Sequence, residues 1–208
     1  MSNTTARGRR LVLLIALVVV ISLYFPINRT AKGGVILDTT LDSYISLVPI
    51  WIIPYLGGIG LFVLILLWAY RDMPSDTFAA FATSNFIAAG VAYTIYLVYP
   101  TYISRPAITG TDVLSLWVKW LYASDRVYNA FPSGHAFYTV IAWLYLWHWQ
   151  SKMRVATTVV ATLVLLSTLF TKQHNIVDLV GGIVLGVASV WVGRKLVSRP
   201  PQTSSDSE

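Results

Sequence analysis

Cysteine is absent from this chain of 208 residues, and charged residues make up only 12% of it. The absence of cysteine excludes a disulfide framework and thiol chemistry. A soluble domain of this length would carry about twice that charged fraction. Hydrophobic residues instead make up 56% of the chain, and the mean hydropathy is +0.65. The composition therefore favours an integral membrane protein with no soluble domain.

Long segments with almost no charge are the candidates for crossing the membrane. A helix that spans a bilayer needs about 20 mostly apolar residues. Six segments approach this length, the fourth with the help of residues 131–135: Leu11–Asn28, Tyr44–Tyr70, Thr77–Tyr99, Ala136–Gln150, Val155–Thr171 and Val177–Gly193. We expect an all-α membrane protein, a bundle of six transmembrane helices forming one domain over residues 1–198. The polar residues 199–208 are expected to form a disordered cytoplasmic tail.

The N-terminus also resembles a signal peptide, because Arg9 and Arg10 precede the apolar run Leu11–Phe25. No convincing small-x-small cleavage site follows this run, which is also long for the core of a signal peptide. We therefore favour a first helix that is retained.

The basic residues of the short loops predict the orientation. With six spans both termini lie on one side, which holds nine of the fifteen Lys and Arg residues. Because basic loop residues favour the cytoplasm, we expect a multi-pass protein of the cell membrane with both termini cytoplasmic. No basic run is interleaved with exposed aromatic residues, so nucleic acid is not an expected partner. The oligomeric state is left open.

The loop between the third and fourth predicted spans contains an amphipathic segment, Asp112–Tyr122. Asp112 is suited to cap a short helix. Trp117, Trp120 and Tyr122 are suited to a membrane interface, where amphipathic rings are favoured. We expect a short interfacial helix that either only anchors the domain or forms one wall of a lipid entry route.

Two of the three histidines stand in polar segments at predicted span ends: Asn129-Ala-Phe-Pro-Ser-Gly-His135, and Lys172-Gln-His174 with Asp178. Ionisable residues at a membrane are costly and mark functional sites. With Arg105-Pro106, these segments fall on the same, outer, side of the predicted topology. The third histidine, His148, lies beside two tryptophans at the opposite face and is interpreted as an interface residue.

The residue types in these segments suit phosphate chemistry. His174 and Asp178 are four apart, so on a helix their side chains share a face. The carboxylate would keep one imidazole nitrogen protonated and leave the other free to attack. Ser133 and Gly134 stand where a loop enters a helix, and free N–H groups there bind anions. Asn129 is either a turn residue or a substrate contact.

In these residues the chain resembles the type-2 phosphatidic acid phosphatase superfamily, the integral-membrane lipid phosphate phosphatases. The central block of that family, Pro-Ser-Gly-His, is intact as Pro132–His135. Arg105-Pro106 match the first block, although Val98 stands where a lysine is expected. Ser167, His174 and Asp178 match the third block, although Thr168 replaces its arginine. The resemblance covers about residues 41–190. The Ser167–His174 string with Asn129–Ser133 most resembles the inositol phosphorylceramide synthase-like branch, and Leu41-Asp42 followed by Val48–Trp51 fits that branch too.

The resemblance implies a phosphatase that hydrolyses a lipid phosphate monoester through a phosphohistidine on His174, with His135 as the acid and Asp178 orienting His174. It implies substrate binding by Arg105, Ser133, Gly134 and Lys172, without a metal or other cofactor. Lys172 would replace the missing cations if the helix continued from Thr168. The expected partners are a lipid phosphate and membrane lipids, with the site on the extracytoplasmic face. Two alternatives remain: a phosphotransferase that moves a phosphorylated headgroup to a lipid alcohol, and a catalytically silent lipid-binding or transport protein.

Overall fold

The computed structural model describes residues 3–198, with side chains from residue 7 onward. Within this range the regular structure is helical, and only two isolated β-bridges occur outside the helices. The helices are α1 Asn3–Ser22, α2 Tyr24–Thr30, α3 Ile52–Asp72, α4 Ser75–Val98, α5 Val113–Ser124, α6 Gly134–Trp149, α7 Arg154–Phe170 and α8 Ile176–Val197, with the 3-10 turns η1 Thr40–Tyr44, η2 Pro49–Trp51 and η3 Ser151–Met153. The expected all-α class is confirmed for these residues. The predicted tail, residues 199–208, lies outside them.

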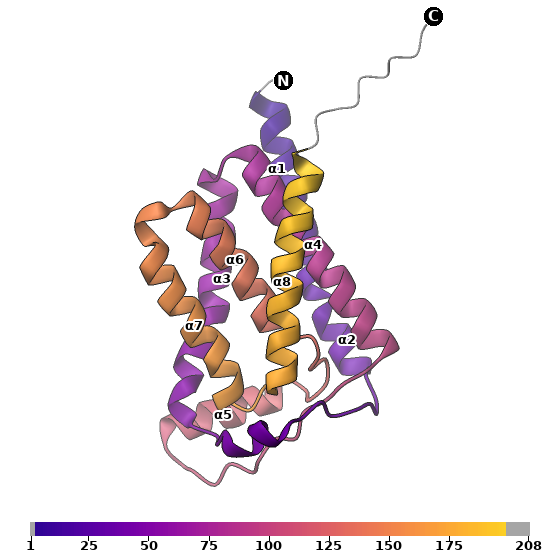
Figure 1. Ribbon diagram of the computed structural model, residues 1–208, viewed down its shortest axis with the longest axis vertical. Coiled ribbons are helices and arrows are strands. Elements are labelled where there is room, and N and C mark those ends of the chain that lie inside the picture. The colour runs from indigo at the N-terminus through magenta and orange to yellow at the C-terminus, as the bar shows by residue number, and fades with distance from the viewer. Residues whose placement is uncertain (1–2, 199–208) are drawn as a thin grey trace, which may run out of the picture.

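The long helices run side by side along the long axis of the molecule, and α5 lies across the lower end (Figure 1). The first residues of α1 and the last residues of α8 lie together at the upper end. The lower end holds α5, the start of α6 and the turn between α7 and α8. We call it the histidine end, because His135 and His174 belong to the last two of these segments.

Five helical segments are long and apolar enough to cross a membrane: Arg7–Thr30, Pro49–Asp72, Ser75–Val98, Ser151–Phe170 and Ile176–Val197. They correspond to five of the six predicted spans. Helix α6 has only 16 residues and is about 24 Å long, shorter than a bilayer crossing requires. The chain reaches its start through a non-helical approach in which Asn129, Ala130 and Ser133 are buried. The sixth span therefore remains a prediction.

The first helix is built into the bundle. Proline lacks an N–H, and its ring clashes with the carbonyl group four residues earlier. Pro26 therefore accounts for the break between α1 and α2 at Leu23. Leu17 of α1 is fully buried in the core. The Arg10 guanidinium donates to carbonyl oxygens at the end of α3, among them that of Met73 at 2.7 Å. A cation is favoured there by the helix dipole.

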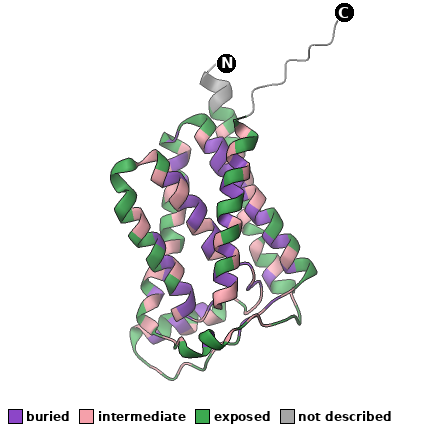
Figure 2. Cartoon of the chain, viewed as in Figure 1, coloured by how far each residue is buried: buried purple, intermediate pink, exposed green. Residues whose placement is uncertain are grey.

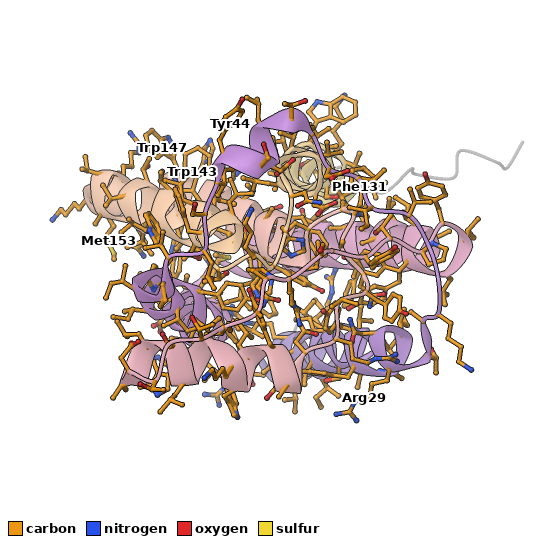
Figure 3. The ribbon with its side chains drawn as sticks, turned by 90° about the horizontal axis from the view of Figure 1, so that it is seen from below. Arg29, Tyr44, Phe131, Trp143, Trp147 and Met153 are labelled. Atoms are coloured by element: carbon orange, nitrogen blue, oxygen red, sulfur yellow. The ribbon has the colours of Figure 1, made fainter. Side chains whose placement is uncertain are left out.

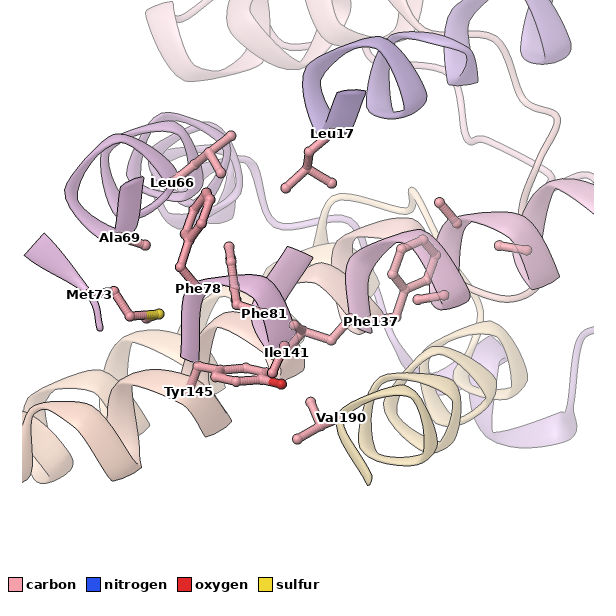
Figure 4. Close-up of a cluster of buried hydrophobic side chains, with 14 of the residues drawn as sticks. Leu17, Leu66, Ala69, Met73, Phe78, Phe81, Phe137, Ile141, Tyr145 and Val190 are labelled. Carbon is pink, nitrogen blue, oxygen red and sulfur yellow. The ribbon is translucent and has the colours of Figure 1, made fainter. Parts of the chain in front are cut away.

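The core lies between α1, α3, α4, α6 and α8. It contains Leu17, Leu66, Ala69, Met73, Phe78, Phe81, Phe137, Ile141, Tyr145 and Val190 (Figure 4). The outward faces of the helices are exposed along their length (Figure 2), yet they too are apolar. Val12 is 66% exposed, Leu64 63% and Val184 62%. An apolar belt of this extent would be unfavourable in water, so a lipid environment accounts for it.

Two glycines allow α8 to lie directly against α6. A Cβ on Gly182 would lie 2.5 Å from the Ser133 carbonyl oxygen, and a Cβ on Gly186 would lie 3.0 Å from Val140 Cβ. Small residues permit this close approach, as in other membrane helix pairs. Gly182 and Gly186 therefore have a packing role, which fixes the start of α6 beside the start of α8.

Helix α5 begins as predicted, because the Asp112 carboxylate accepts hydrogen bonds from the N–H groups of Leu114 and Ser115. Seen from below, α5 and η1 lie on opposite sides of the histidine end (Figure 3). Trp117 is 47% exposed and Trp120 is 60% exposed. The position of α5 at a membrane interface stays a prediction.

Candidate functional site

The structure brings the two motif histidines together. His135 is the second residue of α6, and His174 belongs to the turn between α7 and α8. Their ring centroids are 5.9 Å apart, with the planes inclined at 61°. The ring of Tyr55 from α3 also packs against His135, with the ring centroids 4.5 Å apart. Three elements distant in sequence therefore meet at the histidine end.

His174 and Asp178 lie close, but not for the reason that their spacing predicted. Helix α8 begins only at Ile176, so His174 precedes it and the two residues do not share a helix face. Asn175 caps the helix, and Asp178 Oδ2 accepts a hydrogen bond from the Asn175 N–H at 2.8 Å. The same oxygen lies 3.8 Å from His174 Nδ1, beyond hydrogen-bond distance. Catalytic hydrogen bonds are often this long before substrate binds.

The start of α6 is fixed against α8. The Ser133 N–H donates to the Asp178 carbonyl oxygen at 2.9 Å, and Ser133 Oγ accepts a bond from the Ala136 N–H. Ser133 is fully buried. The prediction that its free N–H binds an anion is therefore wrong, because that N–H is occupied. Among the described residues the Gly134 N–H has no acceptor, so Gly134 keeps its predicted capacity.

Arg105 reaches the site from the loop after α4. Its Nη1 donates to the carbonyl oxygens of Asp125 at 2.7 Å and Tyr122 at 3.3 Å. Its Nη2 donates to Gln173 Oε1 at 2.6 Å and to the Arg126 carbonyl oxygen at 3.4 Å. The guanidinium also lies 4.6 Å from the centre of the Tyr122 ring. Arg105 therefore ties the loop after α5 to the residue next to His174.

Lys172 is not on the face of α7 that the sequence predicted. Helix α7 ends at Phe170, and Lys172 has a left-handed backbone with φ 53°. Its ammonium group donates to the Asp42 carbonyl oxygen at 2.9 Å. Thr168, which stands at the motif arginine, is fully buried and donates its hydroxyl to Leu165. The helix continuation that would have aligned Lys172 with Thr168 does not occur.

Asp42 is a structural residue of the site that sequence reasoning did not assign. One carboxylate oxygen accepts from the Ile176 N–H at 2.8 Å, at the first residue of α8. The other accepts from the N–H and hydroxyl of Thr39. Asp42 thus fastens η1 to the turn that carries His174. The capping pattern Thr-x-x-Asp at residues 39–42 was the signal that could have indicated it.

Asp125 is a third carboxylate near the site, after Asp178 and Asp42. The Tyr24 hydroxyl donates to it at 3.0 Å. Burial raises the pKa of Asp125 above its ordinary value, while the Tyr24 hydrogen bond and the Arg105 guanidinium partly oppose this shift. Asp125 lies outside the motif segments in the sequence, so the sequence alone did not identify it as a site residue.

Unpaired polar atoms are concentrated in this region. Nine buried side-chain nitrogen or oxygen atoms among the described residues have no hydrogen-bond partner. Six of them belong to Arg105, Asn129, Gln173, His174 and Asp178. Buried polar groups are normally paired, so such a concentration is expected where a polar ligand binds. In residues 3–198 no group of three His, Cys, Asp or Glu side chains is placed to hold a metal ion.

The comparisons with known proteins agree with this location. No curated protein and no solved structure gave a significant match. The family model of the PAP2 superfamily matches residues 98–201, half of the chain. The match includes every predicted site residue, from Arg105 to Asp178, and supports an enzyme of phosphatase or phosphotransferase type. By this match, the chain belongs to the PAP2 superfamily.

Proposed function

We propose that this protein is a membrane-embedded lipid phosphate phosphatase that hydrolyses a lipid phosphate monoester through a phosphohistidine. The convergence of His135 and His174, with Asp178 3.8 Å from His174 Nδ1, is the observation that carries the proposal. A catalytically silent lipid-binding or transport protein has no need for two adjacent imidazoles beside a buried carboxylate.

His174 is the nucleophile. Asp178 faces its Nδ1, so this nitrogen holds the proton and Nε2 carries the free electron pair. Nε2 attacks phosphorus, and the bond from phosphorus to the lipid oxygen breaks. The ring becomes positively charged as it bonds to phosphorus, and the Asp178 carboxylate stabilises that charge.

His135 is the general acid and then the general base of the reaction. It donates a proton to the lipid oxygen as that oxygen leaves, which yields a lipid alcohol. The neutral imidazole then accepts a proton from water, and the resulting hydroxide attacks the phosphohistidine. Inorganic phosphate leaves and His174 is regenerated. The Tyr55 ring, 4.5 Å from His135, restricts the orientation of the acid.

The phosphoryl group is bound without a metal. The Gly134 N–H lies at the start of α6, where free N–H groups bind anions, and it donates to the phosphoryl group. Ser133 contributes by fixing this helix start to Asp178. The charges of Arg105 and Lys172 make the pocket electropositive and stabilise the charge that develops in transfer.

Substrate approaches from the outer leaflet of the cell membrane, with both termini in the cytoplasm. A surface depression of about 420 Å³ is lined by Leu56, Trp117 and Trp120, at the edge of the histidine end. This is the position at which a lipid could keep its chains in the bilayer while its headgroup enters. A membrane-impermeant inhibitor such as vanadate should then block turnover when added outside intact cells. Inhibition only after the membrane is opened would invert the proposed topology.

A phosphotransferase is the second candidate, and the branch related to inositol phosphorylceramide synthase supplies its model. Val98 and Thr168 occupy the positions of two motif cations. Fewer cations reduce the preference for a doubly charged phosphate monoester over a singly charged phosphodiester. Water and a lipid alcohol can occupy the same attacking position, so the chemistry of the two candidates is otherwise identical.

A substrate panel distinguishes the candidates. The purified protein should be incubated with phosphatidic acid, polyprenyl phosphate and phosphatidylglycerol phosphate, and with a phosphodiester lipid plus a lipid alcohol. Release of inorganic phosphate supports the phosphatase. Transfer of the headgroup without phosphate release supports the transferase. The absence of both activities would contradict an enzymatic function.

A further inference from the structure

Arg105 is the arginine of the first motif block, which is expected to bind phosphate, yet its hydrogen bonds are made to protein groups. Each of its two Nη nitrogens has two acceptors, three backbone carbonyl oxygens and Gln173 Oε1. A guanidinium has five N–H groups, of which four belong to these nitrogens. Only Nε lacks a partner, and it is buried. Arg105 therefore has little capacity left for direct contact with a phosphate.

Gln173, in contrast to Arg105, has donors that are not used by the described part of the protein. It is 4% exposed, and its Oε1 accepts the bond from Arg105 at 2.6 Å. Because a guanidinium only donates, the amide oxygen must face Arg105 and the amide nitrogen must face away. That nitrogen, Nε2, is buried and has no hydrogen-bond partner. Two N–H donors are thus fixed in direction, one residue from His174.

The residues at the two missing cation positions cannot supply these donors. Val98 is apolar and 79% exposed at the end of α4. Thr168 is fully buried, and its hydroxyl already donates to Leu165. An oxyanion at the site therefore lacks two of the ligands that the motif would provide, while Gln173 has two donors without an acceptor.

We propose that the side-chain amide of Gln173 binds a non-bridging oxygen of the phosphoryl group, and that Arg105 is a positioning residue that acts through Gln173. This inference rests on the proposed function, because it assigns a ligand within the same site. In this proposal Arg105 does not bind the phosphate directly. The phosphate is bound by the neutral amide of Gln173, which Arg105 orients and polarises.

The substitution Gln173→Glu tests the ligand. Glutamate has nearly the same shape, and one of its oxygens retains the bond to Arg105, now as an ion pair. The other oxygen replaces the NH₂ donor and repels an anion. We expect the inhibition constant of orthovanadate to rise about 10- to 100-fold, the value of one hydrogen bond to a charged group, without a fall in melting temperature. An unchanged vanadate constant would show that Gln173 only holds Arg105 in place.

A double-mutant cycle tests the role of Arg105. Arg105→Gln should weaken vanadate inhibition in the wild-type background and have little further effect in a Gln173→Met background, because its action passes through Gln173. An equal loss in both backgrounds would identify Arg105 as a direct ligand and overturn the inference. Arg126→Gln is the matched control, since Arg126 is an exposed arginine in the loop after α5 whose side chain donates to the Arg29 carbonyl oxygen. It should leave vanadate inhibition unchanged.

The wild-type protein separates failure of this inference from failure of the proposed function. If it shows neither turnover of any lipid phosphate nor inhibition by vanadate, the proposed function is wrong and the inference falls with it. If the wild type is active and vanadate-sensitive but Gln173→Glu is equally sensitive, only the inference is wrong.

Discussion

The Tyr55 ring lies against the His135 ring, with centroids 4.5 Å apart and planes inclined at 36°. Tyr55 is 1% exposed and belongs to α3, whereas His135 is the second residue of α6. This contact restricts the orientation of His135 from a helix outside the family match, which covers residues 98–201. It also gives the first prediction.

Removing the Tyr55 ring should impair turnover while the hydroxyl should matter less. Tyr55→Leu is expected to lower kcat about 2- to 10-fold, because an aromatic contact contributes about 0.5–1.5 kcal/mol. Tyr55→Phe keeps the ring and should retain most activity. Steady-state kinetics on one lipid phosphate measures both. Equal losses in the two variants would mean that the hydroxyl, and not the ring, supports His135.

His135→Ala should lower turnover of a lipid phosphate about 10²–10⁴-fold, the usual contribution of general acid–base catalysis. The loss in the phosphorylation step should be smaller for an ester with a good leaving group, which departs without a proton. Single-turnover kinetics on both esters separates the steps. Equal losses in that step on both esters would argue against an acid role.

Gly182→Leu should disrupt the site through packing. A Cβ at this position would lie 2.5 Å from the Ser133 carbonyl oxygen, so α8 must move away from the start of α6. We expect a loss of activity and a lower melting temperature. Gly60→Ala is the control, because a Cβ at Gly60 meets no atom within 4 Å, and alanine favours a helix. Normal activity in Gly182→Leu would show that the contact between α6 and α8 is not needed.

Activity should survive a chelator such as EDTA. The proposed mechanism assigns charge stabilisation to helix N–H groups and protein side chains, so no step depends on a metal ion. Phosphate release should be measured after dialysis against EDTA, with magnesium restored in a parallel sample. Activity that requires added magnesium would show that the site has been misread.

The helices could be predicted well from the sequence because a chain in lipid must satisfy its backbone hydrogen bonds internally, and only long apolar helices do so here. The predicted span Thr77–Tyr99 agrees with α4, Ser75–Val98. The apolar run around α6 was harder, because residues 131–133 continue its composition although the helix begins at Gly134. Composition alone does not mark that boundary.

The location of the site could be predicted, but its hydrogen bonds could not. Segments at the same end of a helical bundle must meet, so His135 and His174 were expected to converge. The bonds of Lys172 and Arg105 depend on loop conformations, including a left-handed backbone at Lys172, that no local pattern specifies. Asn175 and Asp178 form a capping box that specifies the start of α8 after His174. The spacing of His174 and Asp178 predicted one shared helix face, so this capping pair was not identified from the sequence.

Trapping the phosphoenzyme tests the central claim most directly. The wild type should be mixed with a lipid phosphate, quenched with base to preserve phosphohistidine, and mapped by mass spectrometry. We predict an acid-labile phosphoryl group on His174, absent from His174→Ala together with turnover, and unaffected by His148→Ala at the opposite end of α6. Normal turnover by His174→Ala, or a phosphoryl group trapped on another residue, would contradict the mechanism.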